Sequence, residues 1–159
     1  MRKITGTEKT FKQLLQNTKY TIHYYQREYA WQYKQVQELI DDLTDEFLIF
    51  YDPSHERYEV QNYGVYFMGS VVLAGRENAI IDGQQRLSSL SLLLIYLRQR
   101  LIKIGATHTT IDQMIYSESY GSESFNISVE DREPCLSALN EGRDFDPTGY
   151  GESVINLYD

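Results

Sequence analysis

Apolar residues in the first fifty positions recur at spacings that predict a helix, a strand and a second helix. Thr10 precedes Phe11, Leu14 and Leu15, so we expect a short capped helix there. Residues 20–25 are rich in aromatic and β-branched side chains and predict a strand. A longer amphipathic helix is expected from Trp31 to about Phe50. Its predicted core face consists of Val36, Leu39, Ile40, Leu43 and Phe47.

Two further apolar stretches predict a β-hairpin followed by a central helix. Residues 66–74 are the strongest strand pattern, and 75–78 supply a turn into a second strand at 79–82. Gly69 inside the first strand indicates a bulge or a close approach to the backbone. After Arg86 the sequence is apolar nearly all round the helix up to Gly105, a plausible C-cap, so this helix should be central. Its apolar residues at helical spacing are Leu87, Leu90, Leu94, Leu97 and Leu101.

The last third of the chain carries weaker patterns. Residues 111–115 suggest a short helix, 125–129 a strand, and 131–139 another short helix, whereas 142–151 are typical of a loop. We therefore predict an α/β (α+β) fold, a small mixed sheet with a β-hairpin and flanking helices, as one domain over residues 1–142. Residues 143–159 are expected to be a loop and the start of a following helical region that is truncated.

Composition limits the possible functions. The chain of 159 residues has 15 Lys and Arg against 23 Asp and Glu, and its charge of −8 disfavours tight binding to unmodified DNA. Cys135 is the only cysteine, and no apolar run could span a bilayer, so we expect a soluble, cytoplasmic protein without membrane contact. The sequence contains no nucleophile elbow, Walker-type loop or metal-ligand spacing of histidines. Asp42 with Asp45 or Glu46 could pair on a metal, but a solvated acidic helix face is the favoured interpretation.

Residues 79–87 hold the most distinctive polar stretch. The pattern predicts a strand, a turn at Asp82 and Gly83, and the start of a helix for which Asp82 would be the N-cap. Free N–H groups at that helix start and the guanidinium of Arg86 would form an anion site, with phosphate as the usual occupant. Gln84 and Gln85 add amides that suit a nucleotide. The alternative is a plain helix cap with solvated glutamines.

A second polar stretch, residues 22–31, resembles a known family together with the first. Its sequence IHYYQREYAW is similar to the Ile-Pro-x-Tyr-Gln-Arg-x-Tyr-x-Trp signature of the GmrS-like N-terminal domain, with His23 where that family often has proline. The sequence IDGQQRLSSL at 81–90 resembles the family's Asp-Gly-Gln-Gln-Arg signature. The strand pattern at 67–73 also looks like the family's. The resemblance covers residues 8 to about 105, with a weak extension over 125–142.

The resemblance implies a fold like those of ParB and sulfiredoxin, and a nucleoside triphosphate site with Mg²⁺. Hydrolysis would serve a modification-dependent restriction system that defends against phage. Modified DNA would be a partner, in the context of a longer protein or of a partner nuclease. The family's nuclease half is absent from these residues, so cleavage of DNA by this chain is not expected. The alternative function is a non-catalytic ParB-like module that senses DNA or mediates interactions. The oligomeric state stays open.

Site residues follow from the resemblance and from residue chemistry. Arg27, Arg86 and Asp82 would be catalytic, and Asp82 would hold the metal or orient water. Tyr29 and Trp31 offer rings on which a base can stack. The residues that would contact the nucleotide are Gln26, Arg27, Gly83, Gln84, Gln85, Arg86, Tyr29 and Trp31.

Overall fold

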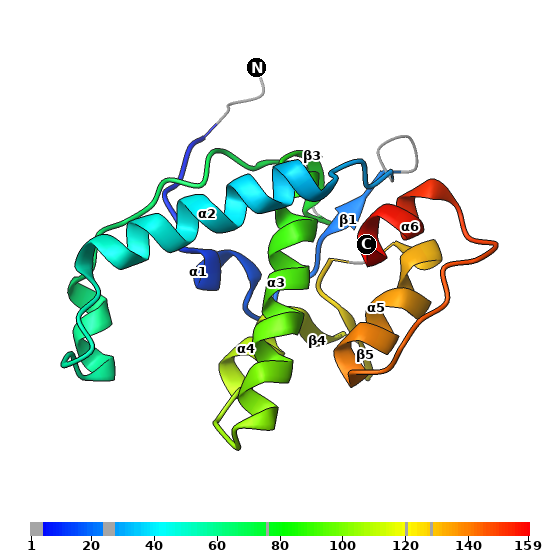
Figure 1. Cartoon of the computed structure of the whole chain (residues 1–159). Helices are drawn as coiled ribbons and strands as arrows, with labels where there is room; N and C mark the ends of the chain where they lie inside the picture. The colour runs from blue at the N-terminus through cyan, green and yellow to red at the C-terminus, as the bar shows by residue number, and fades with distance from the viewer. Residues whose placement is uncertain (1–4, 24–27, 76, 120, 128) are drawn as a thin grey trace.

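The fold is α+β, as the sequence predicts, with helices around a small sheet and a separate hairpin (Figure 1). A computed structural model describes residues 5–23, 28–75, 77–119, 121–127 and 129–159. The likeness to ParB and sulfiredoxin stays a prediction. In chain order, with η for 3₁₀ helices, the elements are α1 (Phe11–Leu15), β1 (Thr21–Ile22), α2 (Tyr33–Phe50), η2 (Arg57–Asn62), β2 (Val72–Ala74), β3 (Ala79–Asp82), α3 (Gln84–Lys103), α4 (Thr109–Ile115), β4 (Tyr116–Ser119), β5 (Ser122–Phe125), η3 (Glu130–Arg132), α5 (Glu133–Glu141) and α6 (Glu152–Tyr158).

The sheet is mixed and has β3 at its centre. β1 pairs with β3 in parallel, and β2 pairs with β3 antiparallel, so the predicted hairpin is confirmed. The predicted strand over 66–74 is wrong in its first part, because only Val72–Ala74 is a strand. Gly69 has a φ of +91°, which an extended strand cannot contain. The expected close approach to its backbone is present and involves a side chain of α3, described below.

The hydrophobic core gathers around α3 and the sheet. Ile80 of β3 and Leu87 of α3 are almost completely buried, and α4, α5 and α6 add further apolar side chains. α6 lies beyond the predicted domain boundary at 142, yet its residues Val154 and Leu157 belong to the same core. Cys135 is fully buried, and burial raises the pKa of its thiol to about 11, which fits a structural role.

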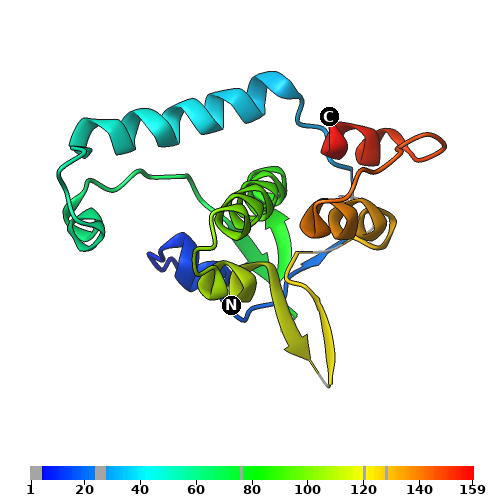
Figure 2. The same ribbon diagram turned by 60° about the horizontal axis from the view of Figure 1, so that its bottom comes forward.

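α2 has the expected extent, but its predicted core face is only partly covered. Of its residues, all of which are described, only Leu39 is buried, and the side chain of Phe47 is 42% exposed. In two views the helix runs outside the body formed by α3 and the sheet (Figures 1 and 2). We call residues 33–68 the arm. Its tip packs on itself, since Phe47 stacks on Tyr51 at 5.3 Å and lies 5.4 Å from Tyr63 between ring centroids.

A second hairpin includes Phe125, the first residue of the strand predicted over 125–129, but Asn126, Ile127 and Val129 are not part of a strand. β4 and β5 pair antiparallel from Tyr116 opposite Phe125 to Ser119 opposite Ser122. Their polar, serine-rich sequence does not show the apolar alternation that usually reveals a strand. Beyond β5, an isolated parallel bridge joins Ile127 to Tyr20.

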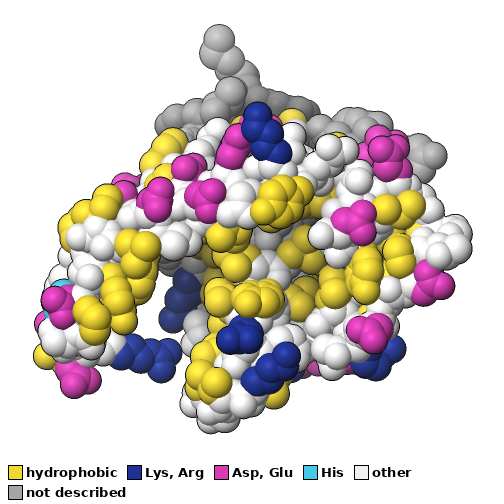
Figure 3. Space-filling model, in the orientation of Figure 1, with side chains coloured by type: hydrophobic (Ala, Val, Ile, Leu, Met, Phe, Trp, Pro, Cys, Tyr) yellow, Lys and Arg dark blue, Asp and Glu magenta, His cyan; other side chains and the backbone are white. Residues whose placement is uncertain are grey.

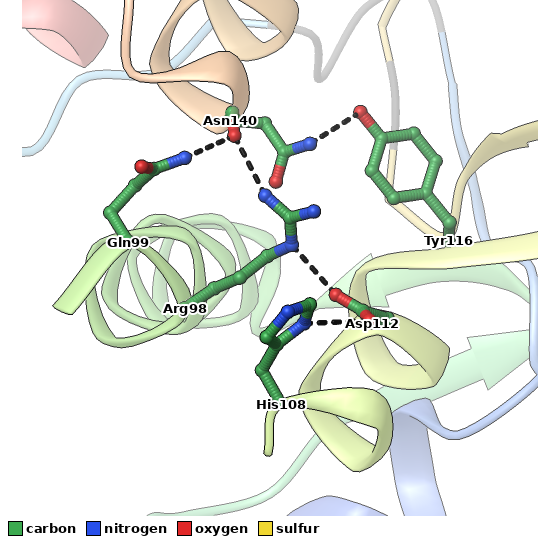
Figure 4. A network of polar contacts seen from close by, with 6 residues as sticks. All are labelled: Arg98, Gln99, His108, Asp112, Tyr116 and Asn140. Atoms are coloured by element: carbon green, nitrogen blue, oxygen red, sulfur yellow. Dashed lines mark hydrogen bonds and ion pairs between the residues drawn. The ribbon is translucent and has the colours of Figure 1, made fainter. Parts of the chain in front are cut away.

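A polar network ties α3 to α4, β4 and α5 (Figure 4). Arg98 Nε donates to Asp112 Oδ1 at 2.6 Å, and the other carboxylate oxygen of Asp112 lies 2.8 Å from His108 Nδ1. Arg98 Nη1 and Gln99 Nε2 both donate to the carbonyl oxygen of Asn140. These contacts join three helices through charged and amide groups, which makes Asp112 the acceptor that holds α4 to α3.

We expect Asp112→Asn to lower the free energy of unfolding by about 1–3 kcal/mol, because it weakens a charge-assisted hydrogen bond to Arg98. Urea denaturation measures this. Asp144→Asn, at an exposed position, is the matched control and should change stability by less than about 0.5 kcal/mol. Equal effects of the two substitutions would show that the network does not stabilise the fold.

Candidate functional site

Gly83 forms the turn between β3 and α3. It is the N-cap of α3, with a φ of +89° that favours glycine. A Cβ atom there would lie 3.2 Å from the carbonyl oxygen of Ser70 and 3.2 Å from Val71 Cγ2. The prediction that Asp82 is the N-cap is therefore wrong: Asp82 is the exposed last residue of β3. Gly83 can take the cap position because it tolerates both the left-handed conformation and the close packing.

Gln85 joins the two signature segments. Its Oε1 accepts from the backbone N–H of Ala30 at 2.9 Å and of Trp31 at 3.3 Å, and its Nε2 donates to the carbonyl oxygen of Glu28 at 2.7 Å. A predicted ligand-binding amide thus holds a backbone segment more than fifty residues away in sequence. Gln26 and Arg27, predicted with it, lie outside the described residues, but the chain that directly follows them is held at the start of α3.

Arg86 lies in a cleft between the arm and the first turns of α3. Its Nη1 donates to the carbonyl oxygen of Ser70 at 3.2 Å. A Cβ atom on Gly69 would lie 2.9 Å from the same nitrogen, so the guanidinium packs directly on the glycine backbone. The cleft has a volume of about 360 Å³, and its lining consists of Trp31, Gln35, Glu38, Leu39, Asp42, Tyr66, Phe67, Met68, Gly69 and Arg86.

Two carboxylates of α2 share this cleft with Arg86. Glu38 and Asp42 are four residues apart and line the same side. Tyr66 donates its hydroxyl proton to Asp42 Oδ2 at 2.6 Å. The pKa of Tyr66 is raised, chiefly by this hydrogen bond, while the positive charge of Arg86 acts in the opposite direction. The described lining therefore has one positive and two negative side chains.

The two aromatic residues predicted for base stacking have different surroundings. Trp31 is half-buried at the cleft. Tyr29 is only 2% exposed, and its hydroxyl oxygen lies 2.7 Å from Ser89 Oγ, so its ring does not offer a free stacking surface. Burial is the main cause that raises the pKa of Tyr29. Of the two rings, Trp31 is the one that a ligand in the cleft could contact.

Sequence reasoning missed Arg132, which packs against Tyr29. The guanidinium carbon lies 5.9 Å from the centre of the Tyr29 ring, and Nε donates to Ser153 Oγ at 3.2 Å. The side chain is 4% exposed, and burial lowers its pKa to about 10. Ser153 Oγ also accepts from the backbone N–H of Tyr29, so α6 and η3 together fix this end of the signature segment. In the sequence, the only signal at Arg132 is its position beside Asp131 at the start of a predicted helix. Charged residues in such a position are usually solvated.

Gln84, which is predicted to contact the nucleotide, is the first residue of α3. The side-chain Oε1 of Gln84 is buried and has no hydrogen-bond partner within the described part of the chain. Among the same residues, no group of three or more His, Cys, Asp or Glu side chains could hold a metal ion. No helix in the described ranges has the length and apolar character to cross a membrane.

Comparison with known proteins identifies the family. The sequence model for the N-terminal domain of the GmrSD restriction endonuclease matches residues 11–150, which is most of the chain. The protein therefore belongs to the GmrSD N-terminal domain family, and the predicted family is confirmed. No curated protein matches the chain.

We expect Gln85→Ala to lower the free energy of unfolding by about 1–3 kcal/mol, because it leaves the backbone groups of Glu28, Ala30 and Trp31 without their partner. Chemical denaturation tests this. Gln84→Ala is the matched control on the neighbouring residue, whose Oε1 has no partner to lose. A larger loss for Gln84→Ala than for Gln85→Ala would contradict the bracing role of Gln85.

Proposed function

We propose that the chain binds a nucleoside triphosphate with Mg²⁺ in the cleft at Arg86 and hydrolyses it, as the regulatory half of a modification-dependent restriction system. The observation that carries the proposal is the bond of Gln85 to residues 28–31, which joins the described end of one signature to the other signature next to the cleft. The cleft volume of about 360 Å³ lies within the range of small-molecule sites. Family membership supports the connection to restriction.

The electrostatics of the cleft favour a nucleotide that enters together with a cation. One guanidinium faces two carboxylates, so a bare triphosphate would be repelled by Glu38 and Asp42. Mg²⁺ is usually held by one or two carboxylates together with substrate phosphates, a donor set that these residues fit. The metal would supply charge neutralisation on the phosphate oxygens. Asp82 is proposed to hold it or to orient water, and Asp42 is the carboxylate within the cleft that could serve instead.

The reaction is the attack of water on the terminal phosphorus, with cleavage of the bond to the bridging oxygen and release of nucleoside diphosphate and phosphate. Arg86 would bind and neutralise phosphate oxygens, and Trp31 would stack on the base. Arg27, Gln26 and Gly83 are proposed to complete the site. In the cytoplasm, this hydrolysis would regulate a nuclease, in a longer protein or a partner, that acts on modified phage DNA.

The roles of Arg86 and Asp82 can be separated with alanine substitutions. Arg86→Ala should weaken nucleotide binding by about 1.5–3 kcal/mol with or without Mg²⁺, because one charged hydrogen-bonding contact is lost. Asp82→Ala should preserve metal-free binding and sharply reduce turnover. Calorimetry with and without Mg²⁺ and single-turnover hydrolysis measure the two effects. A normal single-turnover rate for Asp82→Ala would refute its catalytic role, and Asp42→Asn, measured in parallel, shows whether a cleft carboxylate acts instead.

The cleft itself can be tested through Gly69, which does not need to touch the ligand. Gly69→Ala should weaken nucleotide binding, though less than Arg86→Ala, because the new Cβ would displace the guanidinium without removing it. Gly75→Ala is a matched control: its φ of +73° imposes similar backbone strain, but nothing lies within 4 Å of the added atom. Titration of nucleotide into both variants measures the two affinities. Equal affinities for the two variants would place the phosphate site away from Arg86.

A further inference from the structure

Two exposed parts of the molecule have opposite charge. The arm, residues 33–68, contains eight Asp or Glu and only two Lys or Arg. α3 contains four Lys or Arg and no acidic residue. Of these, Arg86 lies in the cleft and Arg98 pairs with Asp112. The remaining cations of α3, Arg100 and Lys103, are both exposed.

The arm surface combines this negative charge with apolar side chains. We define it by Phe47, Phe50 and Val60 with the neighbouring Asp45 and Glu46. Val60 is 45% exposed, and a hollow of about 190 Å³ lies between α2 and the returning chain. The hollow is lined by Leu43, Glu46, Phe47, Val60, Tyr63, Gly64 and Tyr66. Apolar surface of this kind beside charged groups is typical of a protein interface.

The helix-end surface, at the C-terminus of α3, has the complementary character. It consists of Leu97, Ile102 and Ile104, flanked by Arg100 and Lys103. Ile104 is 74% exposed, so most of its aliphatic side chain is available for a contact. In the space-filling view, hydrophobic and basic side chains lie together over this end of α3 (Figure 3).

The two surfaces do not meet within one chain. Open space separates the tip of the arm from the lower end of α3 (Figure 3). We propose that the arm surface of one chain docks on the helix-end surface of a second copy, and that the reciprocal contact forms at the same time. Each copy carries both surfaces, so two equivalent contacts close a symmetric dimer. Apolar burial would supply affinity, and the opposite charges would select the pairing.

Charge reversal tests this pairing. The arm variant Asp45→Lys with Glu46→Lys, and the helix-end variant Arg100→Glu with Lys103→Glu, should each be monomeric, because both contacts then join like charges. Mixing the two variants should restore a dimer, because every contact in the mixed dimer again joins opposite charges. Sedimentation velocity at about 100 μM chain detects dimers with a Kd up to roughly that concentration. The wild-type dimer should weaken at high salt.

Two controls make the result decisive. Asp144→Lys and Lys12→Glu change charge at exposed positions outside both surfaces and should leave the dimer intact. Circular dichroism and melting temperature confirm that each variant is folded. A monomeric wild-type chain, or mixed variants that stay monomeric, would overturn the proposal.

Discussion

The hydrogen bonds of Gln85 are the constraint on which the arrangement of the site depends. One amide at the second position of α3 satisfies three backbone groups of the segment 28–31. Loop backbone has few other ways to satisfy its polar groups, so this side chain determines where the segment runs. Tyr29 then reaches the interior, where Ser89, Ser153 and Arg132 hold it. The start of α3 therefore supports residues 28–31 of the first signature and is itself part of the second.

The molecule has two parts with different energetics. The body around α3 is stabilised by apolar burial and by the polar network of Arg98 and Asp112. The arm has one buried residue in α2, and its aromatic residues pack mainly on one another at the tip. Elements with little burial are the ones that move or bind partners most readily. The cleft at Arg86 lies where these two parts meet, so a ligand there would contact both.

The buried Arg132 and the exposed aromatic arm reverse the usual expectations for those residue types. A guanidinium at 4% exposure is costly, and its contact with the Tyr29 ring and its bond to Ser153 offset only part of that cost. Through Tyr29 and Ser153, this guanidinium fixes the end of a signature segment. The acidic arm shows the opposite case, apolar side chains that the body of the same chain does not cover.

The sequence by itself determined the elements whose signal is local. Gly83 with the apolar run before it and the Leu-rich run after it gave the strand, turn and helix, and the two signatures gave the family. Tertiary structure alone decided which side chains were free for a ligand. The amide of Gln85 and the ring of Tyr29 are engaged by residues distant in sequence, and of the predicted core face of α2 Leu39 is buried whereas Phe47 is exposed. Periodicity indicates which face of a helix is apolar, but not whether another element covers that face. Burial depends on contacts between segments, and sequence spacing does not encode those contacts.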